Sequence, residues 1–383
     1  MEAVERAHTE VVRVAHLGLD LLTFLQRTEE QLRRVVDYEG AACFFTIDPA
    51  TLLLTGHINE DLAGDDERRR AVNLGVANNE YREEDYNKFA SLARSASTAG
   101  SLAEATEGRL DRSARYHQLI RPFGLEGELR AAFVADGGCW GGIALFRTSD
   151  QPSFDQGNRR FVESISRHLA EGIRTSLVLS SADRDTGAEA PGLILLDDAA
   201  RVEGLNSNAT RWLEELIDPG TPSLDSLPEV IYAVAEQART ANAGFGSHGP
   251  VRHRVPTRTG GWLIIHGTVF EGGKKGAAVI IEPARAPEIA PLLLEAHGLS
   301  DREQAVTFYV LQGLPTSEIA GRLFISAYTV QDHLKAIFEK TGVRSRKALV
   351  AKVFFDHYFP RMQEQNPISS TQWLDGSEES VSG

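Results

Sequence analysis

The chain contains 383 residues, of which 42% are hydrophobic and 25% charged, so it is long enough for two or three domains with ordinary cores. Its formal net charge of -14 is unusual for a DNA-binding protein, and its two cysteines exclude a disulfide framework and a Cys-x-x-Cys metal site. No run approaches the roughly 18 apolar residues of a membrane span and no signal-peptide core begins the chain, so we expect a cytoplasmic protein without membrane contact.

The first region, residues 1–180, mixes helical and strand-like patterns. Apolar residues recur at helical spacing over 4–36, and the run GAACFFTI that follows is typical of a buried strand. The later elements predicted here are strands at 131–135 and 140–147 and a helix from 153 to about 179. This alternation predicts an α/β domain.

The end of this region resembles a GAF domain. In that family a strand W-G-x-I-A-L-F-R, a short F-D segment and a final long helix mark the last central strand and the closing helix. The residues that meet this pattern are Trp140, Gly141, Ile143, Leu145, Phe154, Asp155, Phe161 and Val162. The resemblance implies a GAF-like sensory domain.

Three other features of the first region have plain structural interpretations. The run RRR at 68–70 is predicted to be a solvated helix face. The run NKF at 87–89 matches part of a motif of cyclic-nucleotide-binding GAF domains but lacks its Asp-Glu continuation, so we interpret it as a helix surface. Cys139 would be a candidate redox sensor if it were exposed, but packing in the core is the favoured interpretation.

A polar run without apolar periodicity, SSADRDTGAEAP at 180–191, predicts a linker to a second region. That region, residues 191–283, begins with a strand at 192–196, a polar turn, a second strand through Val202 and a helix opened by Asn206. Later strands are predicted at 251–257, 262–270 and 276–282, with Gly-rich turns between them.

The order of these elements resembles a PAS domain. PAS domains bind small molecules, flavin or haem, or only dimerise, and nothing in this sequence selects among them, so the cofactor stays unknown. His248, His253 and His266 match no metal-ligand spacing, and we interpret them as structural or exposed histidines.

Three prolines within 283–291 lead to a third region, residues 296–360, with four short helical patterns. The expected caps, in chain order, are Ser300 with Glu303 in a capping box, Thr316 or Ser317, Ser326, and Ser345. Two short helices joined by a three- to four-residue turn form a helix-turn-helix, whose second helix enters the major groove of DNA.

The third helical pattern of this region has an apolar stripe and a polar remainder. The stripe consists of Val330, Leu334, Ile337 and Phe338. On the polar faces, Gln331 suits an adenine edge, Asp332 could accept from cytosine, and Lys335 can reach guanine or phosphate. The residues predicted to contact DNA, the last four of them mainly at phosphates, are Thr316, Ser326, Tyr328, Thr329, Gln331, Asp332, Lys335, Lys340, Arg344, Arg346 and Lys347. By themselves these residues also allow a helical bundle whose charges form a solvated face.

The third region resembles the C-terminal DNA-binding domain of LuxR-type bacterial transcription regulators. The matching residues, in order and at the family spacing, are Leu299, Arg302, Glu303, Gly313, Ile319, Ala320, Leu323, Ile325, Ser326, Thr329, Val330, His333, Leu334, Ile337, Lys340, Gly342, Val343 and Arg346. One departure is Gln331, where the family commonly has Lys, and Asp332 follows it. The resemblance implies a helix-turn-helix fold that binds double-stranded DNA.

Charge is distributed unevenly along the chain. Residues 296–360 hold 8 Lys or Arg against 6 Asp or Glu, a net +2, whereas residues 1–295 hold 31 against 44, a net -13. A domain this weakly basic should bind DNA usefully only as a homodimer on paired half-sites. The polar, acidic tail at 361–383 is predicted to be disordered.

The predicted fold class is α+β multidomain, with GAF-like and PAS-like domains before an all-α helix-turn-helix domain. The predicted function is a non-enzymatic transcription regulator, with a small-molecule ligand in the GAF-like or PAS-like domain as its candidate signal. The alternative is a sensory and dimerisation scaffold that acts on a protein partner, with sequence-specific DNA binding weakened by Gln331 and Asp332.

Overall fold

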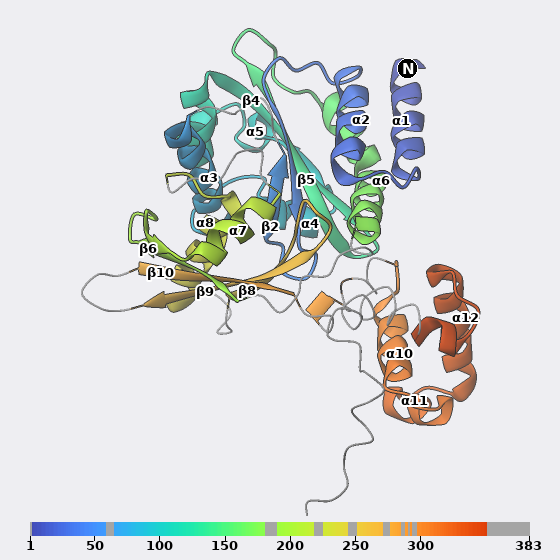
Figure 1. Ribbon diagram of the computed structural model, residues 1–383. Coiled ribbons are helices and arrows are strands. Elements are labelled where there is room, and N and C mark those ends of the chain that lie inside the picture. Colours follow the sequence, from blue (N-terminus) through green and yellow to red (C-terminus); the bar gives the residue numbers. More distant parts are fainter. Residues whose placement is uncertain are drawn as a thin grey trace, which may run out of the picture.

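The computed structural model describes residues 2–58, 65–180, 190–217, 225–243, 251–270, 276–284, 288–289, 292 and 297–350. These residues form two five-stranded antiparallel sheets with covering helices, and a group of C-terminal helices that lies beside them (Figure 1). This mixed α/β architecture with an all-α end confirms the predicted fold class. The expected tail at 361–383 and most of the expected linker lie outside the described residues.

The first sheet has the strand order β2-β1-β5-β4-β3. Its strands are β1 (Ala42–Ile47), β2 (Leu54–Ile58), β3 (Ala99–Ser101), β4 (Leu125–Ala135) and β5 (Gly138–Thr148). Successive side chains of a strand point to opposite faces, so Phe44 and Phe45 belong to two different cores. Both faces are covered, and β1 is therefore buried at every position.

One face of the first sheet is covered by α1 (Glu2–Ala15), α2 (Leu21–Arg33) and α6 (Gln156–Ser180), which lie side by side in Figure 1. The predicted single helix over 4–36 is wrong. Gly18 has a positive φ of 63° in the connection, and Asp20 then caps α2 by accepting from the Thr23 backbone N–H at 3.0 Å. The turn lets both helices pack on α6.

The other face of the first sheet carries shorter elements, several of which the sequence did not predict. They are α3 (Asp66–Tyr81), α4 (Phe89–Arg94), α5 (Leu102–Ala105) and the short helices η1 (Leu110–Arg112), η2 (Tyr116–Ile120) and η3 (Arg121–Phe123). α4, α5 and η2 contact β4, and α3 contacts η2. We call this sheet with its two helical layers the first unit.

The second sheet repeats the strand order of the first, as β7-β6-β10-β9-β8. Its strands are β6 (Gly192–Asp197), β7 (Val202–Leu205), β8 (Val251–Pro256), β9 (Trp262–Phe270) and β10 (Gly276–Pro283), and its helices are α7 (Ser207–Glu215) and α8 (Glu229–Asn242). The predicted strands and the helix opened by Asn206 are confirmed, and the Asn206 side chain accepts from the Ala209 N–H at 2.9 Å. We call this part the second unit.

The two units pack against each other across α8. This helix contacts β9 and β10 of its own sheet and also α3 and β2 of the first unit, and its residues from Glu229 to Glu236 are all buried. Polar contacts also cross the boundary: Arg254 pairs with Asp48 at 2.8 Å, and the Asn73 amide donates to the Leu227 carbonyl at 2.9 Å. The connection between the units is therefore a packed interface.

The C-terminal helices are α10 (Asp301–Leu311), α11 (Thr316–Leu323) and α12 (Ala327–Thr341), and a further helix occupies 346–350 up to the last described residue. Their core is made by residues of all four helices and the connections between them. The predicted capping box of Ser300 and Glu303 is present. The expected cap of the second helix is wrong, because Pro315 precedes it without a side-chain bond and Thr316 is its first residue.

Candidate nucleic-acid interface and a buried cavity

The helix α12 is held in place at its start and along one side. At its start, Ser326 accepts from the Thr329 backbone N–H at 3.0 Å, as the cap predicted from the sequence should. The turn before it is made by Phe324, whose φ of 54° lets α11 end abruptly. Along its inner side Val330, Leu334 and Ile337 are buried against α10 and α11. This is the geometry of a helix-turn-helix.

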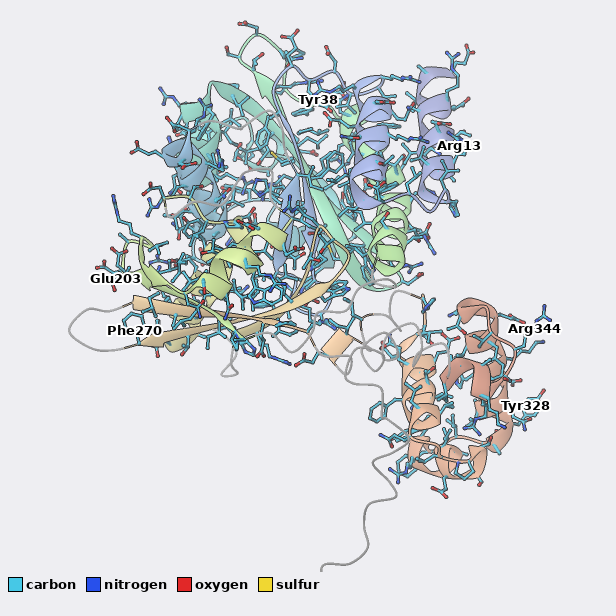
Figure 2. All side chains as sticks on the ribbon, in the orientation of Figure 1. Arg13, Tyr38, Glu203, Phe270, Tyr328 and Arg344 are labelled. Atoms are coloured by element: carbon cyan, nitrogen blue, oxygen red, sulfur yellow. The ribbon has the colours of Figure 1, made fainter. Side chains whose placement is uncertain are left out.

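The opposite side of α12 presents polar side chains to solvent. Gln331, Asp332 and Lys335 are all exposed, and Tyr328 is 73% exposed. Figure 2 shows Tyr328 and Arg344 on the outer side of this helix group, away from the two sheets. Amide, carboxylate, ammonium and phenol groups on one accessible helix are the groups that hydrogen-bond base edges and phosphates.

Two of the residues predicted to contact phosphates already bond to other groups within the C-terminal helices. The Lys340 ammonium donates to the Glu303 carboxylate at 2.7 Å and to the Gly298 carbonyl at 2.9 Å. The Arg346 guanidinium donates to the Leu314 carbonyl at 2.7 Å. Lys340 therefore secures the start of α10, and Arg346 secures the connection before α11, so their contact with DNA stays a prediction that competes with these bonds.

The remaining predicted residues at this end are placed differently. Arg344 and Lys347 are exposed, whereas the Thr316 hydroxyl accepts from Arg346 at 3.4 Å. A shallow open groove brings together Thr316, Gln331, Lys335 and Arg346 from three helices, with apolar side chains of α12 at its base. The helix-turn-helix packing is what gathers them, since they are separated by up to 30 positions in the sequence.

The pKa of Glu303 reflects its place in the capping box. Burial acts to raise the pKa, but hydrogen bonds from Lys340 and Ser300 outweigh burial and leave it below the usual 4.5. The bonds that hold Glu303 at the start of α10 therefore stabilise its charged form.

A second candidate site lies in the first unit, where the sequence carries no motif that identifies ligand-binding residues. A largely enclosed cavity of about 60 Å³ lies between α3 and the first sheet. Its wall contains apolar side chains such as Phe45 and Ile120. The charged residues of the wall are Arg69, Arg115, Glu128, Arg130 and Glu229. These residues come from distant parts of the chain and form no sequence motif.

The structure corrects two interpretations of polar runs near this cavity. In the run at 68–70, Arg69 lines the cavity and its side chain is only 19% exposed, so the run is not simply a solvated helix face. In the run at 87–89, Phe89 is 1% exposed and lies under the Arg130 guanidinium at 4.4 Å from its ring centre. Phe89 is therefore part of the core, and the run is not simply a helix surface.

The cysteines and histidines have structural surroundings. Cys43 and Cys139 are buried and belong to no disulfide, and burial raises the pKa of the Cys139 thiol to about 12, which keeps it protonated and unreactive. Burial lowers the pKa of His253 to about 4, and its ring bonds Thr51 and Gln237. His266 pairs with Glu282 at 2.9 Å, and His248 lies outside the described residues. Within the described ranges no group of three metal-ligating side chains occurs.

None of the helices in the described part of the chain is long and apolar enough to cross a membrane.

Comparison with known proteins matches the C-terminal helices to one family. Residues 297–353 match the model for bacterial regulatory proteins of the luxR family. Over 55 residues the chain is 38% identical to spore germination protein GerE of Bacillus subtilis strain 168, an alignment that covers 14% of this chain and 74% of that protein.

Among solved structures, similarity extends over longer stretches at low levels. The Vibrio cholerae VqmA–ligand–DNA complex is 18% identical and covers 44% of this chain and 83% of that chain, with a TM-score of 0.24. The bacteriophytochrome RpBphP3 of R. palustris is 11% identical and covers 74% and 63%, with a TM-score of 0.30. Scores this low do not establish a common overall fold.

Proposed function

We propose that the chain reads double-stranded DNA with α12 and couples this binding to a signal received by its two α/β units. The chain belongs to the luxR family of bacterial regulatory proteins and is a DNA-binding transcription regulator. The regulator is proposed to act without enzymatic activity of its own. Its proposed location is the cytoplasm.

The observation that carries the proposal is the division of α12 into two sides. Val330, Leu334 and Ile337 fix the inner side in the helical core, while Gln331 and Lys335 stand exposed on the outer side. A reading helix must be rigidly placed and must still present donors and acceptors to base edges, and α12 meets both needs. Gln331 is proposed to read adenine, and Lys335 to bind guanine or phosphate.

The proposed domain organisation is a GAF-like domain at 1–180, a PAS-like domain at 191–283, a luxR-type DNA-binding domain at 296–360 and a tail at 361–383. The repeated strand order of the two sheets supports treating the first two as related sensory domains. The net charge of only +2 in the DNA-binding domain supports a homodimer, because two weakly basic modules on linked half-sites gain affinity from each other.

The test is selection of bound sequences from a random DNA pool by the full-length protein, repeated with Gln331→Ala and Lys335→Ala. We expect a palindromic site, since a two-fold symmetric dimer binds two half-sites of opposite direction. Gln331→Ala should relax one position of each half-site, and Lys335→Ala should lose or weaken the selection.

Absence of any enrichment at low salt, where phosphate contacts are strongest, would contradict the proposal for the signal-free protein. Enrichment of bulk DNA without sequence preference would favour the alternative, a scaffold that acts on a protein partner. Circular dichroism of each variant would show that its helices are intact.

A further inference from the structure

The cavity in the first unit has the size of a small molecule. Its volume of about 60 Å³ is several times the roughly 10–15 Å³ that one water molecule needs by the same measure. α3 supplies Val72 and Val76 to one wall, and β1 and β5 supply Phe45, Ala144 and Phe146 to the opposite wall. Such mainly apolar walls fit a flat apolar body of about one ring.

Each charged residue of the cavity wall has a charged or ionisable neighbour: Arg69 lies 3.3 Å from Asp66, and Glu229 lies 3.4 Å from His57. Arg115 pairs with Glu128 at 2.8 Å, and Arg130 lies 2.5 Å from Glu80 and 3.2 Å from Glu128. The side chains of these four residues are at most 4% exposed. In this network two guanidinium groups and two carboxylates cancel, and Arg69 and Glu229 have neighbours of their own. A charged occupant would therefore lose its hydration without gaining an unpaired counter-ion.

The side-chain carbonyl oxygen of Asn73 is a polar atom that an occupant of the cavity could use. Asn73 lines the cavity and is 1% exposed, and its amide nitrogen donates to the Leu227 carbonyl at 2.9 Å. That bond fixes the orientation of the amide, because a flipped side chain would place two acceptor oxygens together. The Asn73 carbonyl oxygen then has no hydrogen-bond partner within the described ranges, which favours an occupant with an N–H or O–H donor.

The second unit closes this cavity. Glu229, the first residue of α8, lines it together with His57 of β2, and the two side chains approach to 3.4 Å. Leu227, which holds the Asn73 amide, belongs to the segment just before α8. An occupant would therefore touch residues of the first unit and also the start of α8, the helix through which the second unit packs on the first.

We infer that this cavity binds a small uncharged molecule, about one aromatic or heterocyclic ring in size, whose N–H or O–H group donates to Asn73, and that its binding tightens the contact between α3 and α8. Only one part of this inference rests on the proposed function, namely that the bound molecule is the signal that the regulator senses. Binding itself is a property of the two units and does not require DNA.

The test uses the full-length protein without DNA and phenol as the probe, since phenol combines one ring with one O–H donor. Phenol should raise the melting temperature saturably by a few degrees, because a ligand that binds only the folded state stabilises it. Toluene, which has the ring without the donor, and benzoate, which is charged, should raise it less at equal concentration.

The matched variants lie on α3. Val76→Phe fills the cavity and should abolish the phenol shift, whereas Ala71→Phe adds the same ring at an exposed position of that helix and should retain it. Asn73→Leu should make the shifts with phenol and toluene equal. If Val76→Phe does not fold, Ala144→Leu fills the cavity from the sheet side.

A folded wild-type protein without a saturable phenol shift, or a shift that persists after the cavity is filled, would overturn the inference. These outcomes are separate from the pool selection, which is done without phenol. Phenol binding with failed DNA selection would leave the cavity site standing and contradict the proposed function for the signal-free protein, and the reverse result would overturn the cavity site alone.

Discussion

The C-terminal helices and the first unit use polar and charged side chains in opposite ways. On α12, Gln331, Asp332 and Lys335 are exposed, and the helix owes its position to an apolar stripe beneath them. In the first unit, Arg115 and Glu128 are at most 2% exposed, and they owe their position to each other. The polar groups of α12 are accessible to a binding partner, whereas most of those in the first unit pair with one another inside the protein.

The difference lies in how far apart in sequence the cooperating residues are. The polar side of α12 is contained in one helix, so its pattern is visible in a few turns of sequence. The buried network joins Glu80, Arg115, Glu128 and Arg130 from α3, the short helices and β4. Changes in the two regions should therefore have different consequences, with stability lost in the first unit and affinity lost on α12.

The largest effect is expected from Arg115→Leu. Removing one partner of a buried ion pair leaves Glu128 charged and buried, which costs about 3–5 kcal/mol of unfolding free energy. Denaturant unfolding followed by circular dichroism would measure the loss. Arg112→Leu serves as control, because the Arg112 side chain is 42% exposed and should change stability by less than about 0.5 kcal/mol. Equal losses in both variants would contradict the comparison.

Lys335→Ala should weaken DNA binding without weakening the fold. Loss of one such contact with DNA costs about 1–3 kcal/mol of binding free energy, or roughly 5- to 150-fold in affinity. Titration of the selected DNA site at several salt concentrations would measure it. A phosphate contact would also reduce the salt slope by about one, whereas a base contact would not. Arg302→Ala, exposed on α10, is the matched control, and a similar loss there would show that general charge matters more than α12.

Ser300→Ala should cost about 1 kcal/mol of stability in the C-terminal helices, because it removes the side chain that caps α10. Ser317→Ala is the sharpest control. The sequence made Ser317 a candidate cap of the next helix, but that helix begins without a side-chain cap. Thermal unfolding of the two variants should show a lower melting temperature for Ser300→Ala only, and a matching drop for Ser317→Ala would contradict the observed helix start.

The smallest expected effect is on the stability of the protein at acidic pH. Glu303 has its pKa lowered in the folded protein, so its contribution to stability is present above the usual 4.5 and is lost as the pH falls through the lower folded value. Melting temperatures measured from pH 6 down to the acid limit should therefore fall less steeply for Glu303→Gln than for the wild type. Parallel curves would show that the Lys340 contact contributes no charge-dependent stability.

The sequence by itself determined the elements whose signals are local. The capping box of Ser300 and Glu303, the Ser326 cap and the apolar stripe of α12 are each set by residues within a few positions of one another. The strands of both sheets were likewise predicted where runs were continuous and apolar, as at β1 and β5. A helix or strand with one buried face places apolar residues at a regular spacing along the sequence, and this spacing can be recognised without knowledge of the fold.

The tertiary structure alone decided the rest. It broke the predicted N-terminal helix at Gly18, buried Phe89 and placed Arg69 at a cavity wall where polar runs suggested solvent, and gave Lys340 a partner 37 positions away. It also placed Glu229 of α8 at a cavity of the first unit. These outcomes depend on which distant residues meet, and pairwise burial and charge compensation between distant segments leave no periodic trace along the chain.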